Sequence, residues 1–198
     1  RQIVRNHLAQ YGIARMGEMR AKGVTGATLS RMERAGEIVR LARGLYQKAD
    51  ADIVAEHSLA EAAKRAPKGI ICLTSALAFH GLTLQIPRAI AMAFGKSEWF
   101  PRSGQPVIRG VRFEEAYLDH GIETHMIEGV PVRIFGVAKT IADCFRNKRQ
   151  IGNAIAIEGL QEALRQKKAT PAEIMLEAER GRAGRTILPY IEALTTNG

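Results

Sequence analysis

Three glycines, Gly12, Gly23 and Gly36, divide the beginning of the 198-residue chain into short segments whose apolar residues recur with helical spacing. The pattern predicts a helix over Gln2–Tyr11 and a second over Met16–Lys22, each followed by a glycine that ends it. Helices of this length are not stable alone in water. The segment must therefore fold through tertiary packing of short helices.

The next segment carries the strongest helix signals. Thr25 is a good N-cap, and Val24 before it can pack on Leu29, four positions into the helix. Gly36 is expected to close this third helix as a C-cap. Leu29 and Met32 share one face of the helix. The opposite face is small and basic, with Ala27, Ser30, Arg31 and Arg34.

A tight basic hairpin is predicted after this helix. Residues 37–40 and 45–47 have strand character, and residues 41–44 form the turn between them. Three short helices followed by such a hairpin are typical of a winged helix-turn-helix, in which the third helix enters the major groove of DNA and the wing lies along the backbone or minor groove.

Charge is concentrated in the same region. The whole chain has a net charge of +9. Residues 1–48 contain ten basic and three acidic side chains, a net charge of +7, whereas the other 150 residues contain nineteen bases and seventeen acids. The distribution makes double-stranded DNA the favoured partner of the first domain.

Individual residues of this domain have different expected roles. Arg31 and Arg34, with Thr28 near the helix start, can reach base edges, because a guanidinium matches the two acceptors of guanine. Arg40, Arg43 and Lys48 are expected to contact phosphates. The predicted DNA-binding residues lie on the third helix, at its cap, or on the hairpin: Thr25, Thr28, Arg31, Arg34, Arg40, Arg43 and Lys48.

Two alternatives remain for these basic residues. The arginines could form a solvated surface that binds nothing, or the winged domain could serve contacts with other proteins. The combination of topology, short helices, hairpin and local charge favours DNA.

The domain division follows from charge and pattern. We expect a winged helix-turn-helix domain over 1–48, a connecting segment over 49–66 with an amphipathic helix from 52 to 66 that includes Ile53, and a C-terminal domain over 67–198. The sequence predicts an α+β fold with a small, mostly antiparallel sheet and C-terminal helices. Strands are expected at 88–94, 107–113, 122–127 and 132–135. Helices are expected at 74–80, from 137 to about 145, and at 151–168, 171–180 and 185–194.

Composition limits the class of protein. With 46% hydrophobic and 25% charged residues, the chain is an ordinary globular protein. No apolar run approaches the length of a membrane span, and residues 1–30 lack the apolar core of a secretory signal, so we expect a cytoplasmic protein without membrane contact. Because the chain begins at Arg1, we expect a few native residues to precede it. The two cysteines, Cys72 and Cys144, lie in apolar stretches and are expected to be buried free thiols.

A search for catalytic or cofactor motifs finds none. Gly95-Lys96-Ser97 resembles the end of a phosphate-binding loop, but position 90 is Ile where that loop needs glycine. No lysine has an acid two residues before it, as a restriction-type nuclease would require. The histidines lack metal-ligand spacing, and His80 is expected to end a helix or to lie bonded in the core. Asp143 is a candidate buried acid with a structural role. We expect no enzyme, no cofactor and no metal.

Several longer segments resemble one known family. They are Gly36–Ile38 and Arg43–Tyr46 in the hairpin, and Ile71–Leu77, Phe79–Thr83, Gly121–His125, Gly129–Val132 and Ala138–Phe145 beyond it. Together they resemble the AbiEi antitoxins of type IV toxin-antitoxin systems, also described as abortive-infection E transcriptional regulators. Where the family usually opens its second helix with threonine or serine, this chain has Arg15-Met16.

The resemblance implies a repressor of its own operon that binds inverted repeats through an N-terminal winged domain. It also implies a C-terminal domain that contributes to repression and antitoxicity. The partner toxin would resemble a nucleotidyltransferase and would be countered without a stable complex. Two other functions remain open: an interaction protein whose C-terminal domain counters the toxin or its target, with DNA binding secondary, and an enzyme of unrecognised type.

Overall fold

A computed structural model describes residues 1–51 and 56–195, and the chain divides into two compact units. Unit 1 consists of Arg1–Lys68 together with two later segments, Pro101–Ile108 and Thr124–Val132. Unit 2 consists of Gly69–Phe100, Arg109–Glu123 and the chain from Arg133.

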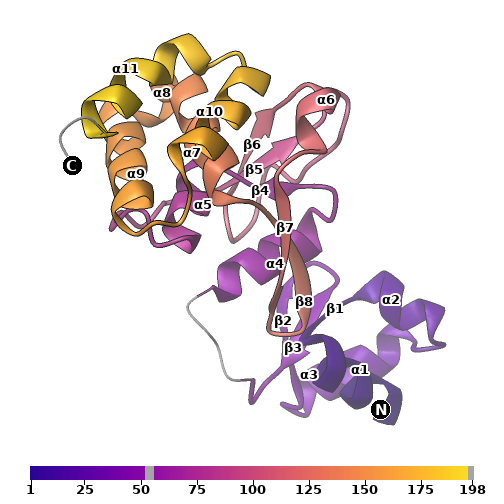
Figure 1. Cartoon of the computed structure of the whole chain (residues 1–198). Coiled ribbons are helices and arrows are strands. Elements are labelled where there is room, and N and C mark those ends of the chain that lie inside the picture. The colour runs from indigo at the N-terminus through magenta and orange to yellow at the C-terminus, as the bar shows by residue number, and fades with distance from the viewer. Residues whose placement is uncertain (52–55, 196–198) are drawn as a thin grey trace. The chain divides into compact units, whose positions relative to one another are not determined.

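Unit 1 combines short helices with a small sheet (Figure 1). Its helices are α1 (Gln2–Tyr11), α2 (Met16–Ala21), α3 (Gly26–Arg34) and α4 (His57–Arg65), and its strands are β1 (Ile13–Arg15), β2 (Ile38–Ala42) and β3 (Leu45–Lys48). The strands pair antiparallel in the order β1-β3-β2. Val4 and Leu8 of α1 share one core cluster with Leu29 and Met32 of α3.

The predicted cap of the third helix is confirmed. Thr25 is the N-cap, and its Oγ1 accepts a hydrogen bond from the Thr28 N–H at 3.3 Å. At the other end the C-cap residue is Ala35, one position before the expected glycine. Gly36 follows with φ 69° and donates to Glu33 O, while Glu37 N–H donates to Met32 O. These two bonds make a Schellman ending, which favours glycine at this position.

The hairpin is observed with a shorter turn than predicted, because β2 extends to Ala42. The register shifts between Arg40 and Ala42, which marks a β-bulge. Strand β1 was not predicted. It is three residues long, and Ile13 lies opposite Gln47 of β3.

The unusual start of α2 is compensated by its third residue. The Glu18 carboxylate accepts a hydrogen bond from the Arg15 N–H at 2.8 Å, which satisfies one of the free donors at the helix start. The helix therefore forms without threonine or serine at the cap. The expected connecting helix is observed as α4, from His57 to Arg65, and the first part of that prediction, residues 52–55 with Ile53, lies outside the described residues.

Unit 2 has an α+β fold, as predicted, and its sheet is mixed. The strands are β4 (Ile70–Ile71), β5 (Ile90–Phe94), β6 (Ile108–Arg112), β7 (Ile122–Ile127) and β8 (Val130–Phe135), in the order β6-β5-β4-β8-β7. Strand β4 pairs antiparallel with β5 and parallel with β8. The sheet is thus less uniformly antiparallel than expected, because β8 reaches β4 after a long excursion of the chain.

The C-terminal helices gather around α7 (Figure 1). The helices from α5 onward are α5 (Leu73–Phe79), α6 (Glu115–Leu118), α7 (Val137–Arg146), α8 (Lys148–Ile151), α9 (Asn153–Arg165), α10 (Pro171–Arg180) and α11 (Gly184–Thr195). The helix predicted over 151–168 begins only at Asn153, because Gly152 has φ 95°, and ends at Arg165. Helix α10 has its predicted bounds, with a capping box between Thr170 and Glu173. Helices α6 and α8, four residues each, were not predicted.

Both cysteines are free and buried in the unit 2 core, as predicted. Among the described residues, no helix combines the length and apolar character that crossing a membrane requires.

Candidate nucleic-acid interface

Helix α3 separates its apolar and basic faces as predicted. Leu29 and Met32 are fully buried. The outward face consists of Ala27, Ser30, Arg31 and Arg34, all exposed. Because a face of small residues lets a helix approach another molecule closely, the two arginines can extend beyond it without obstruction.

The arginine side chains of α3 are held in similar ways. Arg31 Nε donates to Ala27 O and Arg34 Nε donates to Ser30 O, each at 3.3 Å and each one turn back along the helix. These bonds use only the ε nitrogens. The η nitrogens of both guanidinium groups make no hydrogen bond within the described parts of the chain and can donate to a ligand.

Thr28 lies at the edge of this face. It is half-buried, and its Oγ1 is 3.1 Å from Thr25 Oγ1 at the helix start. Both hydroxyls therefore lie at the N-terminus of α3. In helix-turn-helix proteins, the N-terminal residues of the recognition helix contact base edges.

The β2–β3 hairpin presents a second pair of exposed arginines. Arg40 Nε donates to Ala42 O at 3.3 Å across the bulge. Arg43 lies in the turn, before Gly44, which has φ 72°. Both arginines are therefore placed at the turn end of the hairpin.

None of these four arginines makes an ion pair with any residue in the ranges 1–51 and 56–195. Glu37 is instead paired with Arg5 at 2.8 Å and with Arg1 at 3.5 Å. The hydrogen bond from Arg5 lowers the pKa of Glu37. Glu37 is thus paired with α1 and the chain start and not with the arginines of α3 or the hairpin turn.

Glu18 is likewise paired with a residue outside α3 and the hairpin. Its two carboxylate oxygens accept hydrogen bonds from Lys64 Nζ at 2.9 and 3.1 Å. Burial by itself raises the pKa of Glu18, but the bonds from the Arg15 N–H and Lys64 outweigh it, and the pKa lies below its ordinary value. Two of the three acids of residues 1–48 therefore do not neutralise α3 or the hairpin turn.

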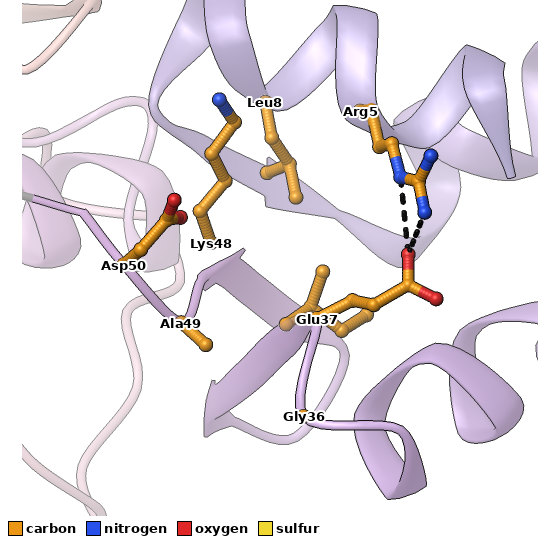
Figure 2. Close-up of a pocket in the computed structure, with 8 residues that line it drawn as sticks. Arg5, Leu8, Gly36, Glu37, Lys48, Ala49 and Asp50 are labelled. Atoms are coloured by element: carbon orange, nitrogen blue, oxygen red, sulfur yellow. Dashed lines mark hydrogen bonds and ion pairs between the residues drawn. The ribbon is translucent and has the colours of Figure 1, made fainter.

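Lys48 is separated from the hairpin turn. It lies at the far end of β3, opposite Ile38, and lines a pocket of about 380 Å³ with Arg5, Glu37 and Asp50. Figure 2 shows the Arg5–Glu37 pair on one side of this pocket and Lys48 with Asp50 on the other. The structure thus groups Arg31 with Arg34 and Arg40 with Arg43, and places Lys48 apart from both pairs.

Two titratable residues of unit 2 considered in the sequence, Asp143 and His80, both contact groups of the fold itself. Asp143 is buried on α7, 3.4 Å from Lys139 Nζ, and burial raises the pKa of Asp143 to about 6 against the opposing effect of that lysine. Lys139 Nζ also lies 4.4 Å from the centroid of the Phe135 ring.

His80 ends α5 and its Nε2 is 2.8 Å from Phe135 O, which confirms the predicted helix-end role. Within the described residues, no three His, Cys, Asp or Glu side chains are placed to hold a metal ion.

One comparison with known proteins matches the beginning of unit 1. The family described as transcriptional regulator, AbiEi antitoxin, matches residues 1–47. The match confirms the resemblance over this segment, which includes α1 to α3 and most of the hairpin.

The whole chain also has a structural relative. It is similar to the crystal structure of the RV2827C protein from Mycobacterium tuberculosis, with a TM-score of 0.60 and 12% sequence identity over 89% of this chain and 70% of that chain. At this identity the likeness concerns the fold alone. No curated protein matches the sequence.

Proposed function

We propose that unit 1 contains a winged helix-turn-helix that binds double-stranded DNA sequence-specifically, and that the protein is a transcriptional repressor of the AbiEi antitoxin type that acts on its own operon. The observation that carries this proposal is the face of α3 formed by Arg31 and Arg34. These side chains are exposed, free of ion pairs within the described residues, and carried by a helix capped at Thr25.

Binding would proceed in two steps. The net charge of residues 1–48 attracts the duplex, and release of its counterions makes the affinity dependent on salt. Helix α3 then enters the major groove, where Arg31, Arg34 and Thr28 contact base edges and Thr25 lies near the phosphates at the helix start. Arg40 and Arg43 at the hairpin turn contact backbone phosphates and fix the register. Lys48 would be a more peripheral phosphate contact.

A mobility-shift titration of the full chain tests this proposal. The probe is the duplex directly upstream of the protein's own gene, and the comparison is a scrambled duplex of the same length and composition. We expect binding to the upstream duplex to be at least about 10³-fold tighter and to weaken steeply between about 50 and 200 mM salt. Equal affinity for both duplexes would reject a sequence-specific repressor.

The antitoxin role is a second part of the proposal and rests on the family matched over residues 1–47. In that role the protein counters a nucleotidyltransferase-like toxin, without a stable complex and without catalysis by the protein itself. The alternative is that unit 2 performs the neutralisation and DNA binding is secondary.

A variant without DNA binding separates the two functions. The double substitution Arg31→Ala with Arg34→Ala, expressed from an unrelated promoter, would be compared with the wild type for rescue of cells that express the toxin candidate. Full rescue by the variant would show that neutralisation does not depend on DNA binding, as the alternative requires. Loss of rescue would make protection depend on DNA binding.

A further inference from the structure

The turn between β7 and β8 belongs to unit 1, although both strands are part of the sheet of unit 2. Its two residues, Glu128 and Gly129, have φ of 48° and 74°, the pair of left-handed conformations typical of a tight type I′ hairpin turn. The chain thus passes from unit 2 into unit 1 and returns through two hydrogen-bonded strands.

The backbone of this turn lies directly against the end of α1. A Cβ atom at Gly12 would lie 1.8 Å from Glu128 O, and one at Gly129 would lie 2.8 Å from Gln10 O. Gly12 itself has φ 63° and joins α1 to β1. Since each contact excludes a side chain, the two glycines allow an approach that other residues would prevent.

The side chain of Glu128 ties two further elements of unit 1 to the turn. Its Oε2 is 2.7 Å from His57 Nδ1 at the start of α4 and accepts a hydrogen bond from Gln47 Nε2 of β3 at 3.3 Å. The carboxylate side chain is only 8% exposed. A second buried acid, Glu61, lies 4.0 Å from His57 Nε2. Removing one member of such a buried group leaves the others without their hydrogen-bond or ion-pair partner, which lowers the stability of the folded state.

We propose that the β7–β8 turn is a latch of unit 1: its contacts with Gly12, Gln47 and His57 hold α1, β1, β3 and α4 in place, and this arrangement supports the position of α3 for DNA binding. The effect on α3 passes through the core, because Val4 and Leu8 of α1 share a cluster with Leu29 of α3. The DNA part of this proposal rests on the proposed function, whereas the seating of the turn does not.

Hydrogen exchange of the full chain tests the latch with a matched pair of variants. Gly129→Asn and Gly23→Asn both place a side chain at a left-handed glycine, with φ of 74° and 78°, but nothing lies within 4 Å of a Cβ at Gly23. We expect Gly129→Asn to raise amide exchange in β1, β3 and α4 at least about tenfold, while Gly23→Asn leaves them unchanged. Exchange in α7 and α9 of unit 2 should be the same in both variants. Equal exchange in the two variants, or a rise throughout both units, would overturn the latch.

Glu128→Gln provides a second variant that keeps the turn glycine. Its control is Glu37→Gln, which removes a partly exposed carboxylate of the same unit that pairs with Arg5 and not with the turn. We expect faster exchange in β3 and α4 and at least fivefold weaker binding to the upstream duplex for Glu128→Gln only. Unchanged exchange in this variant would reject the seating. Faster exchange with unchanged DNA affinity would reject the link between the turn and DNA binding. If the wild type binds no duplex selectively, the proposed function fails, and the exchange data still decide whether the turn is a latch.

Discussion

The two units use their positive charges in opposite ways. In unit 1, Arg31, Arg34, Arg40 and Arg43 are exposed and have no ion pair among the described residues. In unit 2, by contrast, Lys139 and Arg112 are bound by groups of the same unit. Lys139 is 3% exposed beside Asp143, and Arg112 donates to Gly95 O and Glu98 O and lies over the Phe100 ring at 5.0 Å.

Under the proposed function, local pairing, more than the number of basic residues, distinguishes the DNA-binding surface of unit 1 from the structural cations of unit 2. Surface ion pairs contribute little to stability, whereas buried ones are costly to break. Substitutions of the unpaired arginines of unit 1 should therefore reduce DNA affinity, and substitution of a buried cation of unit 2 should reduce folding stability. Four predictions test this contrast.

The largest effect is expected for Lys139→Met. It leaves Asp143 buried without its cation, and we expect the free energy of unfolding to fall by about 3 to 5 kcal/mol. Urea denaturation followed by circular dichroism measures the loss. DNA affinity per folded molecule should stay unchanged.

The matched control for this variant is Arg165→Met. Arg165 is exposed on α9 and pairs with Glu162 at 2.6 Å, so no measurable change in stability is expected. If the two variants were equally stable, the buried pair would have no special structural role.

Protonation of Asp143 should make the free energy of unfolding depend on pH, by about 2 to 3 kcal/mol. Its pKa is about 6 in the folded chain against 3.8 ordinarily, so the folded state binds the proton more tightly than the unfolded state. Relative to Asp143→Asn, the stability of the wild type should therefore decrease as pH rises from about 4 to about 6. Denaturation of both proteins across this range gives the difference, and a difference that does not change with pH would contradict the raised pKa.

A smaller effect, about 1 to 3 kcal/mol of binding free energy, is expected for Arg34→Ala on the upstream duplex. The preference over scrambled DNA should decrease because a base contact is lost. Arg43→Ala, in contrast, should weaken binding to both duplexes equally and make the salt dependence less steep. Fluorescence anisotropy with labelled duplexes measures both. An equal loss on both duplexes for Arg34→Ala would contradict its role in base recognition.

The smallest effect compares two helix caps. Thr25→Ala and Thr170→Ala each remove a threonine whose hydroxyl accepts a backbone N–H at the start of a helix, and each should cost about 1 kcal/mol of stability. Only Thr25→Ala should also weaken DNA binding, because its helix carries Arg31 and Arg34. Equal DNA affinity for the two variants would place α3 outside the interface.

Local signals predicted much of this structure. The cap at Thr25 and the glycine after α3 are each determined by a few neighbouring residues, and both are observed. The basic face of α3 also followed from sequence, because helical periodicity alone decides which side chains lie opposite Leu29 and Met32.

Features that depend on distant residues could not be predicted in this way. Strand β1 is three residues long and exists because Ile13 pairs with Gln47, and the parallel pairing of Ile71 with Ile134 joins segments even further apart. Nothing in the pattern around Glu128 indicates that it approaches His57. The separation of Lys48 from Arg43 likewise follows from the strand register, which places them at opposite ends of β3.

The position of residues 124–132 in unit 1 also affects how the protein is made. A chain is synthesised from its N-terminus, and N-terminal domains usually fold first. Here the first 68 residues lack the turn that contacts Gly12 and His57 until synthesis has passed Val132. Unit 1 is therefore completed only after two segments of unit 2, Gly69–Phe100 and Arg109–Glu123, have been translated, so products that end before Thr124 would lack the turn that completes the basic unit.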